Sequence, residues 1–149
     1  MNNLERYEVA KAGGWSLADS RRVWSVVSYL HSNPDIHFFV NSAPGGDVKV
    51  TDRLIVCCNH RQRGESFDQE LNAIYQQFTG IAQDLGYTGI DKLLDPLEQG
   101  LRAGRSYSWV VSRGETINGQ MLAEILGWRF IDPTELIKFR KDGRLDERS

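Results

Sequence analysis

Residues 7–19 read Tyr-Glu-Val-Ala-Lys-Ala-Gly-Gly-Trp-Ser-Leu-Ala-Asp. The first five of them, Tyr7–Lys11, lean towards apolar residues and predict a short β-strand. This strand leads directly to Gly13 and Gly14, which predict a turn. The stretch therefore indicates a strand that ends in a glycine turn.

A helix is predicted to follow this turn, from Ser16 to Leu30. Asp19 is suited to cap or charge its first turn. One apolar stripe recurs at helical spacing, at Val23, Val26, Val27 and Leu30.

A second strand is predicted at Ile36–Val40, a short run rich in β-forming residues. A mostly apolar run of this kind is typical of a parallel-sheet strand that is covered on both faces. Beyond it we expect a helix capped by Thr51, three longer helices and two short strands. The longer helices are predicted at 67–85, 91–101 and 109–126, with Gly127 ending the last, and the strands at 129–132 and 136–139. The order of elements favours a layered α/β fold with a mainly parallel sheet.

The chain has 149 residues, the size of one compact domain, and a formal net charge of −2. This balance gives no reason to expect a nucleic-acid or membrane partner. No window approaches the roughly 20 apolar residues of a membrane helix, and polar residues at positions 2, 3, 5 and 8 argue against a signal peptide. Cys57 and Cys58 are adjacent, lack zinc-site spacing and are expected to be small buried residues. We therefore expect a cytoplasmic protein without a protein-bound metal.

The first segment that could carry chemistry is Lys11 with Gly13 and Gly14, at the end of the first predicted strand. Glycines allow the backbone to approach an anion closely, and the lysine adds a positive charge. The spacing is not that of a Walker loop. The alternative is an ordinary turn beside a solvated lysine.

The second and third segments are 42–52 and 112–115. Ser42 and Thr51 flank a glycine-rich loop after the second strand, where α/β proteins bind ligands, although Thr51 could serve only as a cap. Gly114 inside a predicted helix calls for close packing or a ligand. Glu115 beside it could bind an ammonium group, and an ordinary surface glutamate is the alternative.

Together these segments resemble the aspartate kinases. Residues 11–19 resemble that family's Lys-Phe-Gly-Gly-Thr-Ser-Val/Leu-Ala-Asp opening, and 42–45 with 49–52 are similar to its second block. Residues 112–115, with 122–123 and 130–132, are similar to its third. The resemblance runs from about Val9 to Asp146.

The resemblance implies an amino acid kinase fold, a three-layer α/β/α sandwich with a mostly parallel sheet, present in truncated form over residues 1–149. It implies transfer of the γ-phosphoryl group of ATP, bound with Mg²⁺, to the β-carboxylate of L-aspartate, in lysine, threonine and methionine biosynthesis. It further implies that Lys11 is catalytic and binds phosphate with Gly13, Gly14 and Ser16. Ser42, Thr51 and Glu115 would bind aspartate.

The sequence departs from the family in two respects, the residues of its first segment and its length. Trp15 stands where the family has Thr or Ser, and Ala12 replaces an aromatic residue, which would leave room for the indole. The family's downstream Arg-Gly-Gly-Ser-Asp segment, its nucleotide-binding half and its regulatory domains are absent from the 149 residues. The alternative to an active kinase is therefore an inactive relic, or a split-enzyme subunit that binds aspartate, a complementing chain or its own copies. A kinase for another amino acid fits the 49–52 and 112–115 blocks less well.

Overall fold

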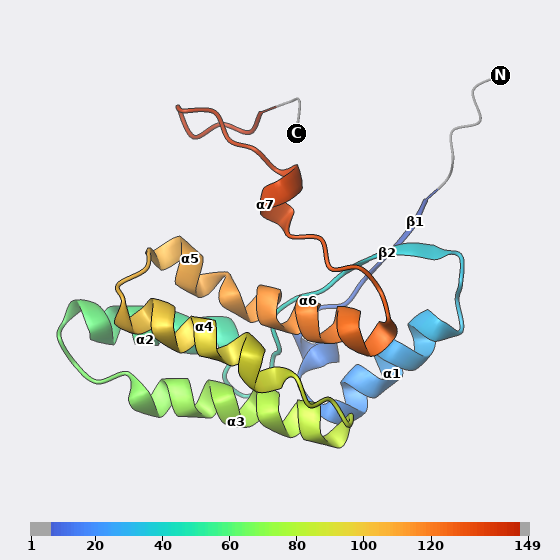
Figure 1. The fold of residues 1–149 in the computed structure, drawn as a ribbon, viewed down its shortest axis with the longest axis horizontal. Helices are drawn as coiled ribbons and strands as arrows, with labels where there is room; N and C mark the ends of the chain where they lie inside the picture. Colours follow the sequence, from blue (N-terminus) through green and yellow to red (C-terminus); the bar gives the residue numbers. More distant parts are fainter. Residues whose placement is uncertain (1–6, 147–149) are drawn as a thin grey trace.

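The computed structural model describes residues 7–146. Two parallel strands lie beside a body of helices, and α7 with the residues after it extends away from that body (Figure 1). The elements are β1 (Glu8–Lys11), a 3₁₀ turn η1 (Gly14–Leu17), α1 (Ser20–His31), β2 (Ile36–Val40), α2 (Val50–Gln62), α3 (Asp68–Asp84), α4 (Ile90–Arg102), α5 (Tyr107–Val111), α6 (Arg113–Leu126) and α7 (Pro133–Leu136).

The two strands confirm the predicted α/β class and its parallel pairing. Lys11 lies opposite Val40 in the register, and α1 forms the crossover between the strands. The expectation that the second strand is covered on both faces is wrong for the described residues. Phe38 is 44% exposed and Val40 49%, and Val9 on β1 is 60% exposed. The helices of residues 7–146 leave much of this strand pair uncovered.

The start of α1 differs from the prediction. The helix begins at Ser20 rather than Ser16, because the Asp19 side chain accepts a hydrogen bond from the Arg22 amide at 3.0 Å. Residues 14–17 form the separate 3₁₀ turn. The capping role of Asp19 is confirmed, but the amino terminus of a long helix does not lie at the two glycines.

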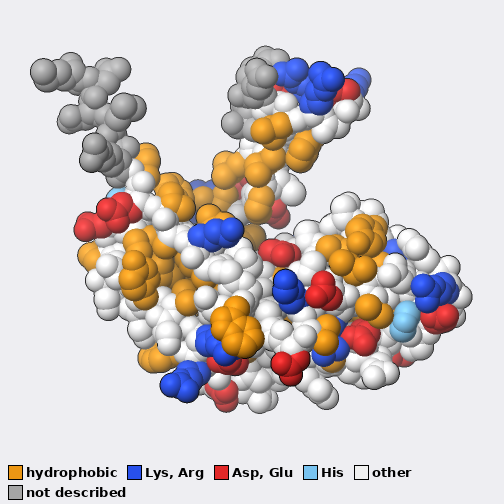
Figure 2. Space-filling model, turned by 180° about the vertical axis from the view of Figure 1, so that it is seen from behind, with side chains coloured by type: hydrophobic (Ala, Val, Ile, Leu, Met, Phe, Trp, Pro, Cys, Tyr) orange, Lys and Arg blue, Asp and Glu red, His pale blue; other side chains and the backbone are white. Residues whose placement is uncertain are grey.

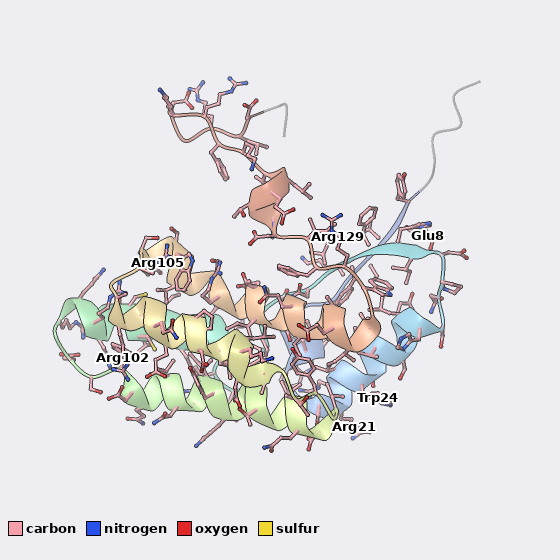
Figure 3. The ribbon with its side chains drawn as sticks, in the orientation of Figure 1. Glu8, Arg21, Trp24, Arg102, Arg105 and Arg129 are labelled. Atoms are coloured by element: carbon pink, nitrogen blue, oxygen red, sulfur yellow. The ribbon has the colours of Figure 1, made fainter. Side chains whose placement is uncertain are left out.

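The helices pack around one apolar core. On α1, Val23, Val27 and Leu30 are buried, while Arg21 and Trp24 point outward (Figure 3). The predicted stripe of α3 is confirmed at all four positions, with Leu71, Ile74, Phe78 and Ile81 buried.

Cys57 and Cys58 lie in this core, as expected. Both are free and buried. Burial, with the nearby Glu70 carboxylate as a smaller cause, raises the pKa of Cys57 to about 12. The thiol is therefore neutral at physiological pH and acts as a small apolar side chain.

The structure differs from the predicted helix boundaries at two other places and agrees with them at Gly127. Thr51 does not cap α2. The helix begins at Val50, whose amide donates to the Pro44 carbonyl at 3.1 Å. The helix predicted over 109–126 is divided at Ser112 into α5 and α6. Gly127 does end α6, in the left-handed conformation at φ +68°.

The two strands predicted near the carboxyl end do not form. Residues 129–132 belong to no helix or strand, and α7 takes Pro133–Leu136. Asp132 starts this turn by accepting hydrogen bonds from the Thr134 amide and hydroxyl, at 2.9 and 2.7 Å. Phe139 makes only an isolated antiparallel bridge with Leu145. Apolar side chains remain exposed on α7 and the residues after it, at Leu136, Ile137, Phe139 and Leu145 (Figure 2).

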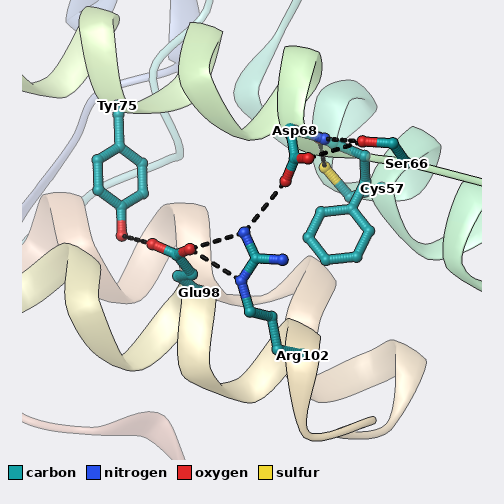
Figure 4. A network of polar contacts seen from close by, with 7 residues as sticks. Cys57, Ser66, Asp68, Tyr75, Glu98 and Arg102 are labelled. Atoms are coloured by element: carbon teal, nitrogen blue, oxygen red, sulfur yellow. Dashed lines mark hydrogen bonds and ion pairs between the residues drawn. The ribbon is translucent and has the colours of Figure 1, made fainter.

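A surface network joins α3 to α4 (Figure 4). Arg102 donates from Nε to Glu98 at 2.9 Å and from Nη2 to Asp68 at 3.1 Å. Hydrogen bonds from Ser66 and then from Arg102 hold the pKa of Asp68 below its usual value. Tyr75 donates to Glu98 at 3.4 Å. All these groups are at least partly exposed, so the network orients the two helices more than it stabilises them.

The close approach of α4 to α5 depends on a glycine, and this gives a stability prediction. A Cβ at Gly100 would collide with the Trp109 ring. We expect Gly100→Ala to lower the free energy of unfolding by about 1–3 kcal/mol through overpacking. Chemical denaturation would measure the change.

Gly80, in the middle of α3, is the matched control. A Cβ there would meet nothing within 4 Å. Gly80→Ala should therefore raise stability by about 0.5–1 kcal/mol, from helix propensity alone. Equal effects at the two positions would contradict the packing of Gly100 against Trp109.

Candidate functional site

The loop that follows β2, residues 41–46, is the point where the three segments singled out in the sequence meet. On one side it lies against the turn after β1. The Ala12 amide donates to the Val40 carbonyl at 3.1 Å, and the Gly45 amide donates to the Gly14 carbonyl at 2.8 Å. The two strand ends therefore lie side by side, as the parallel sheet predicted.

Glycine is required on both sides of this contact. A Cβ at Gly14 would lie 2.9 Å from the Ala43 carbonyl oxygen, and a Cβ at Gly45 would lie 2.8 Å from the Gly14 backbone. The neighbouring Gly46 has φ +134°, a conformation that other residues rarely adopt. The two turns touch backbone to backbone, with no room for side chains between them.

On its other side the 41–46 loop lies against the first two turns of α6. The Asn41 amide nitrogen Nδ2 donates to the Glu115 carbonyl at 2.9 Å, and Asn118 Nδ2 donates to the Ser42 carbonyl at 2.8 Å. A Cβ at Gly114 would come 2.8 Å from Ala43 Cβ. Of the two explanations for a glycine in this helix, close packing is the one that the structure shows.

Gln77 of α3 also holds this loop. Its Nε2 donates to the Gly45 carbonyl at 2.7 Å and to the Ala18 carbonyl at 3.1 Å, so that one side chain joins both turns. No sequence pattern pointed to Gln77 or to the roles of Asn41 and Asn118, because an amide side chain on a helix or after a strand is usually solvated.

The side chains near the first turn line a hollow of about 420 Å³. Lys11 and Ser16 both line it, with Trp15 and Arg22. The Arg22 guanidinium carbon lies 3.7 Å from the centroid of the Trp15 ring. Trp15 is therefore stacked on a cation rather than packed in place of an aromatic at Ala12, which is itself buried. Lys11 and the Ser16 hydroxyl suit an anionic ligand, whereas the Arg22 guanidinium is already paired with Asp19 at 3.0 Å.

Glu115 lines a different hollow of about 410 Å³, formed by the end of β2, the start of α6 and residues 130–134. Asn41, Arg113 and Asp132 also line it. Burial lowers the pKa of Arg113, and hydrogen bonds from Thr134 hold the pKa of Asp132 below its usual value. This hollow offers groups of both charges, as a zwitterion requires.

Only three of the predicted site residues line these two hollows, and Gly13, Gly14, Ser42 and Thr51 line neither. Lys11 and Ser16 line the first and Glu115 the second. Ser42 contributes its backbone carbonyl to the contact with α6, and Thr51 lies half-buried in the first turn of α2. The structure brings the three segments together through their backbones, whereas Lys11 and Glu115 do not line the same hollow.

Within residues 7–146, no helix combines the length and the apolar character needed to cross a bilayer. The same residues contain no group of three or more His, Cys, Asp or Glu side chains that could hold a metal ion.

The sequence matches no protein-family model. It is 32% identical over 127 residues to aspartokinase 3 of Bacillus subtilis strain 168, a match that covers 78% of this chain and 28% of that protein. Among solved structures, the aspartate kinase of Clostridium acetobutylicum is similar over 95% of this chain and 34% of its own, at 35% identity and a TM-score of 0.90.

Aspartokinase III of E. coli is similar in two solved complexes. The complex with aspartate and ADP has a TM-score of 0.65 at 24% identity, covering 82% of this chain and 29% of that one. The complex with lysine and aspartate has a TM-score of 0.67 at 26% identity, covering 81% and 29%. The chain spans about a third of the length of these proteins, and the matches confirm a partial fold of the aspartate kinase type.

The contact between the two turns leads to a prediction at neighbouring glycines. Gly14→Ala should lower the free energy of unfolding by about 1–3 kcal/mol, because the new methyl group meets the backbone of the 41–46 loop. Gly13→Ala should leave stability nearly unchanged, because a Cβ there meets nothing within 4 Å. Thermal and urea unfolding of both variants would test this. A Gly14→Ala variant as stable as the wild type would refute the contact.

Proposed function

We propose that this chain, which is homologous to about a third of an aspartate kinase, binds L-aspartate and the phosphate end of ATP. In the proposed reaction the phosphoryl group of ATP is transferred to the β-carboxylate of L-aspartate. The observation that carries this proposal is the meeting of three segments at the 41–46 loop. A hollow lined by Lys11 and Ser16 lies beside the turn after β1, and a hollow with Glu115 and Arg113 is lined in part by Asn41 of the loop.

The first hollow suits the phosphates. Lys11 would neutralise part of their charge, and Ser16 offers a hydroxyl donor. Gly13 and Gly14 would contribute backbone N–H groups, and the space beside Gly13 is open. Mg²⁺ would arrive with ATP and be held largely by phosphate oxygens.

The second hollow suits the amino acid. Glu115 would accept hydrogen bonds from the α-ammonium group, and Ser42 and Thr51 would help to place the substrate. Phosphoryl transfer depends chiefly on positioning and charge neutralisation, both of which these residues could supply. Because the chain spans about a third of its relatives, we propose that turnover requires the segments found elsewhere in those proteins. The reaction would serve lysine, threonine and methionine biosynthesis in the cytoplasm.

Substitution of Glu115 tests the binding proposal. Glu115→Gln should weaken L-aspartate binding by about 10–100-fold, because a hydrogen bond to a charged group contributes roughly 1.5–3 kcal/mol. Isothermal titration calorimetry with L-aspartate would measure this. Glu124→Gln, on the exposed end of the same helix where Glu124 accepts from Tyr87, should bind like the wild type. A wild-type chain that gives no aspartate signal at millimolar concentration would end the proposal.

The exposed strand pair favours a second candidate, a split-enzyme subunit. Val9, Phe38 and Val40 on the strands, with Ile137 and Phe139 on the carboxyl-terminal arm, present apolar side chains at the surface of the described residues. Such a surface suits a complementing chain or another copy of this one.

A complementation assay separates these candidates. We expect no aspartyl phosphate from this chain alone with ATP, Mg²⁺ and L-aspartate. Turnover should appear when the remaining two thirds of the Clostridium acetobutylicum enzyme are added as a separate chain. Lys11→Ala should abolish it, whereas Lys92→Ala on α4 should not. Hydroxylamine trapping of the acyl phosphate gives the readout. If no product forms even with the added chain, the kinase proposal fails and an inactive binding module is the reading that stands.

A further inference from the structure

The 41–46 loop and α6 are joined by two amide side chains that point in opposite directions. Asn41 reaches from the loop to the Glu115 carbonyl, and Asn118 reaches from the helix to the Ser42 carbonyl. Each asparagine therefore binds the backbone of a residue that is proposed to contact aspartate. The two hydrogen bonds fix Ser42 and Glu115 relative to each other.

Asn118 is an unusual choice for a purely structural residue. It is 0% exposed, and its Oδ1 has no hydrogen-bond partner among the described residues. A buried carbonyl oxygen without a partner loses its hydrogen bonds to water and lowers stability. A leucine of similar size would remove that cost. What the amide contributes is the one hydrogen bond that Nδ2 donates to the Ser42 carbonyl, at 2.8 Å.

The Asn41 side chain packs closely against α6. A Cβ at Gly119 would lie 2.8 Å from Asn41 Oδ1 and 2.8 Å from the Phe130 ring. The absence of a side chain at Gly119 lets the Asn41 amide lie against α6. Asn41 also lines the hollow that contains Glu115.

We propose that Asn41 and Asn118 are positioning residues of the aspartate site. Their reciprocal hydrogen bonds set the position of Ser42 and of the Glu115 backbone, and thereby the width of the site that accepts the substrate. This inference rests on the proposed function, since it assigns a role within the same site. The unsatisfied oxygen of Asn118 is then a cost in stability that accompanies correct geometry.

The test uses Asn118→Leu, which keeps approximate size and removes both the donor and the unsatisfied acceptor. We expect its melting temperature to equal or exceed that of the wild type, while the dissociation constant for L-aspartate rises at least tenfold. Native-state hydrogen exchange should show faster exchange of the Gly45 amide. This amide of the 41–46 loop donates to the Gly14 carbonyl in the turn after β1. A residue that only supported the core would lower the melting temperature and leave both other readouts unchanged.

Two further variants complete the test. Asn41→Ala, at a half-buried position, removes the other hydrogen bond and should also weaken aspartate binding at least tenfold. It gives the answer if Asn118→Leu does not fold. Asn33→Ala is the control, because Asn33 makes the same type of bond, from Nδ2 to the Tyr29 carbonyl at 2.7 Å, at the end of α1. Its aspartate affinity and Gly45 exchange should match the wild type.

The outcomes separate this inference from the proposed function. If the wild type binds aspartate and both Asn41→Ala and Asn118→Leu bind it equally well, the positioning role is overturned and the proposed function stands. If the wild type binds no aspartate, both are overturned. Weakened binding with an unchanged melting temperature supports both.

Discussion

The backbone contact between Gly14 and Gly45 is the constraint on which the rest of the arrangement depends. It places the turns after two parallel strands within hydrogen-bonding distance, and neither position has room for a Cβ. Because these turns touch, Gln77 can bind both of them, and α6 can bind the outer side of the same loop. Lys11 and Ser16 of the first hollow belong to the segment that contains Gly14, and Asn41 of the second belongs to the loop that contains Gly45.

The parts of the fold that depend on local pattern could be predicted from the sequence. Ile36–Val40 and the α3 stripe appear where periodicity placed them, and Asp19 is a cap. The errors arose where tertiary contacts override local preference. The Val50 amide found a backbone acceptor in Pro44, so Thr51 was not needed as a cap. Residues 129–132 pair with neither strand of the described sheet and form no strand.

The candidate site was predictable only in part, for a similar reason. Lys11 with the two glycines, and Glu115 beside Gly114, stand in short segments whose composition suggests ligand binding. Gln77, Asn41 and Asn118 carry no such signal, because an amide acquires its role only when a distant carbonyl is brought to it. The position of Trp15 on Arg22 was equally hidden, since the two residues are separated by a turn and by the start of a helix.

The amide bonds between the 41–46 loop and α6 have a consequence for biosynthesis on the ribosome. They connect residues 74 and 76 positions apart, whereas the pairing of α3 with α4 is local. Contacts of such long sequence separation are closed late, after local structure has formed. As the nascent polypeptide emerges, the glycine turns are exposed first and remain without their helical support until α6 leaves the exit tunnel. Under the proposed function, the aspartate site would be complete only once translation has passed that helix.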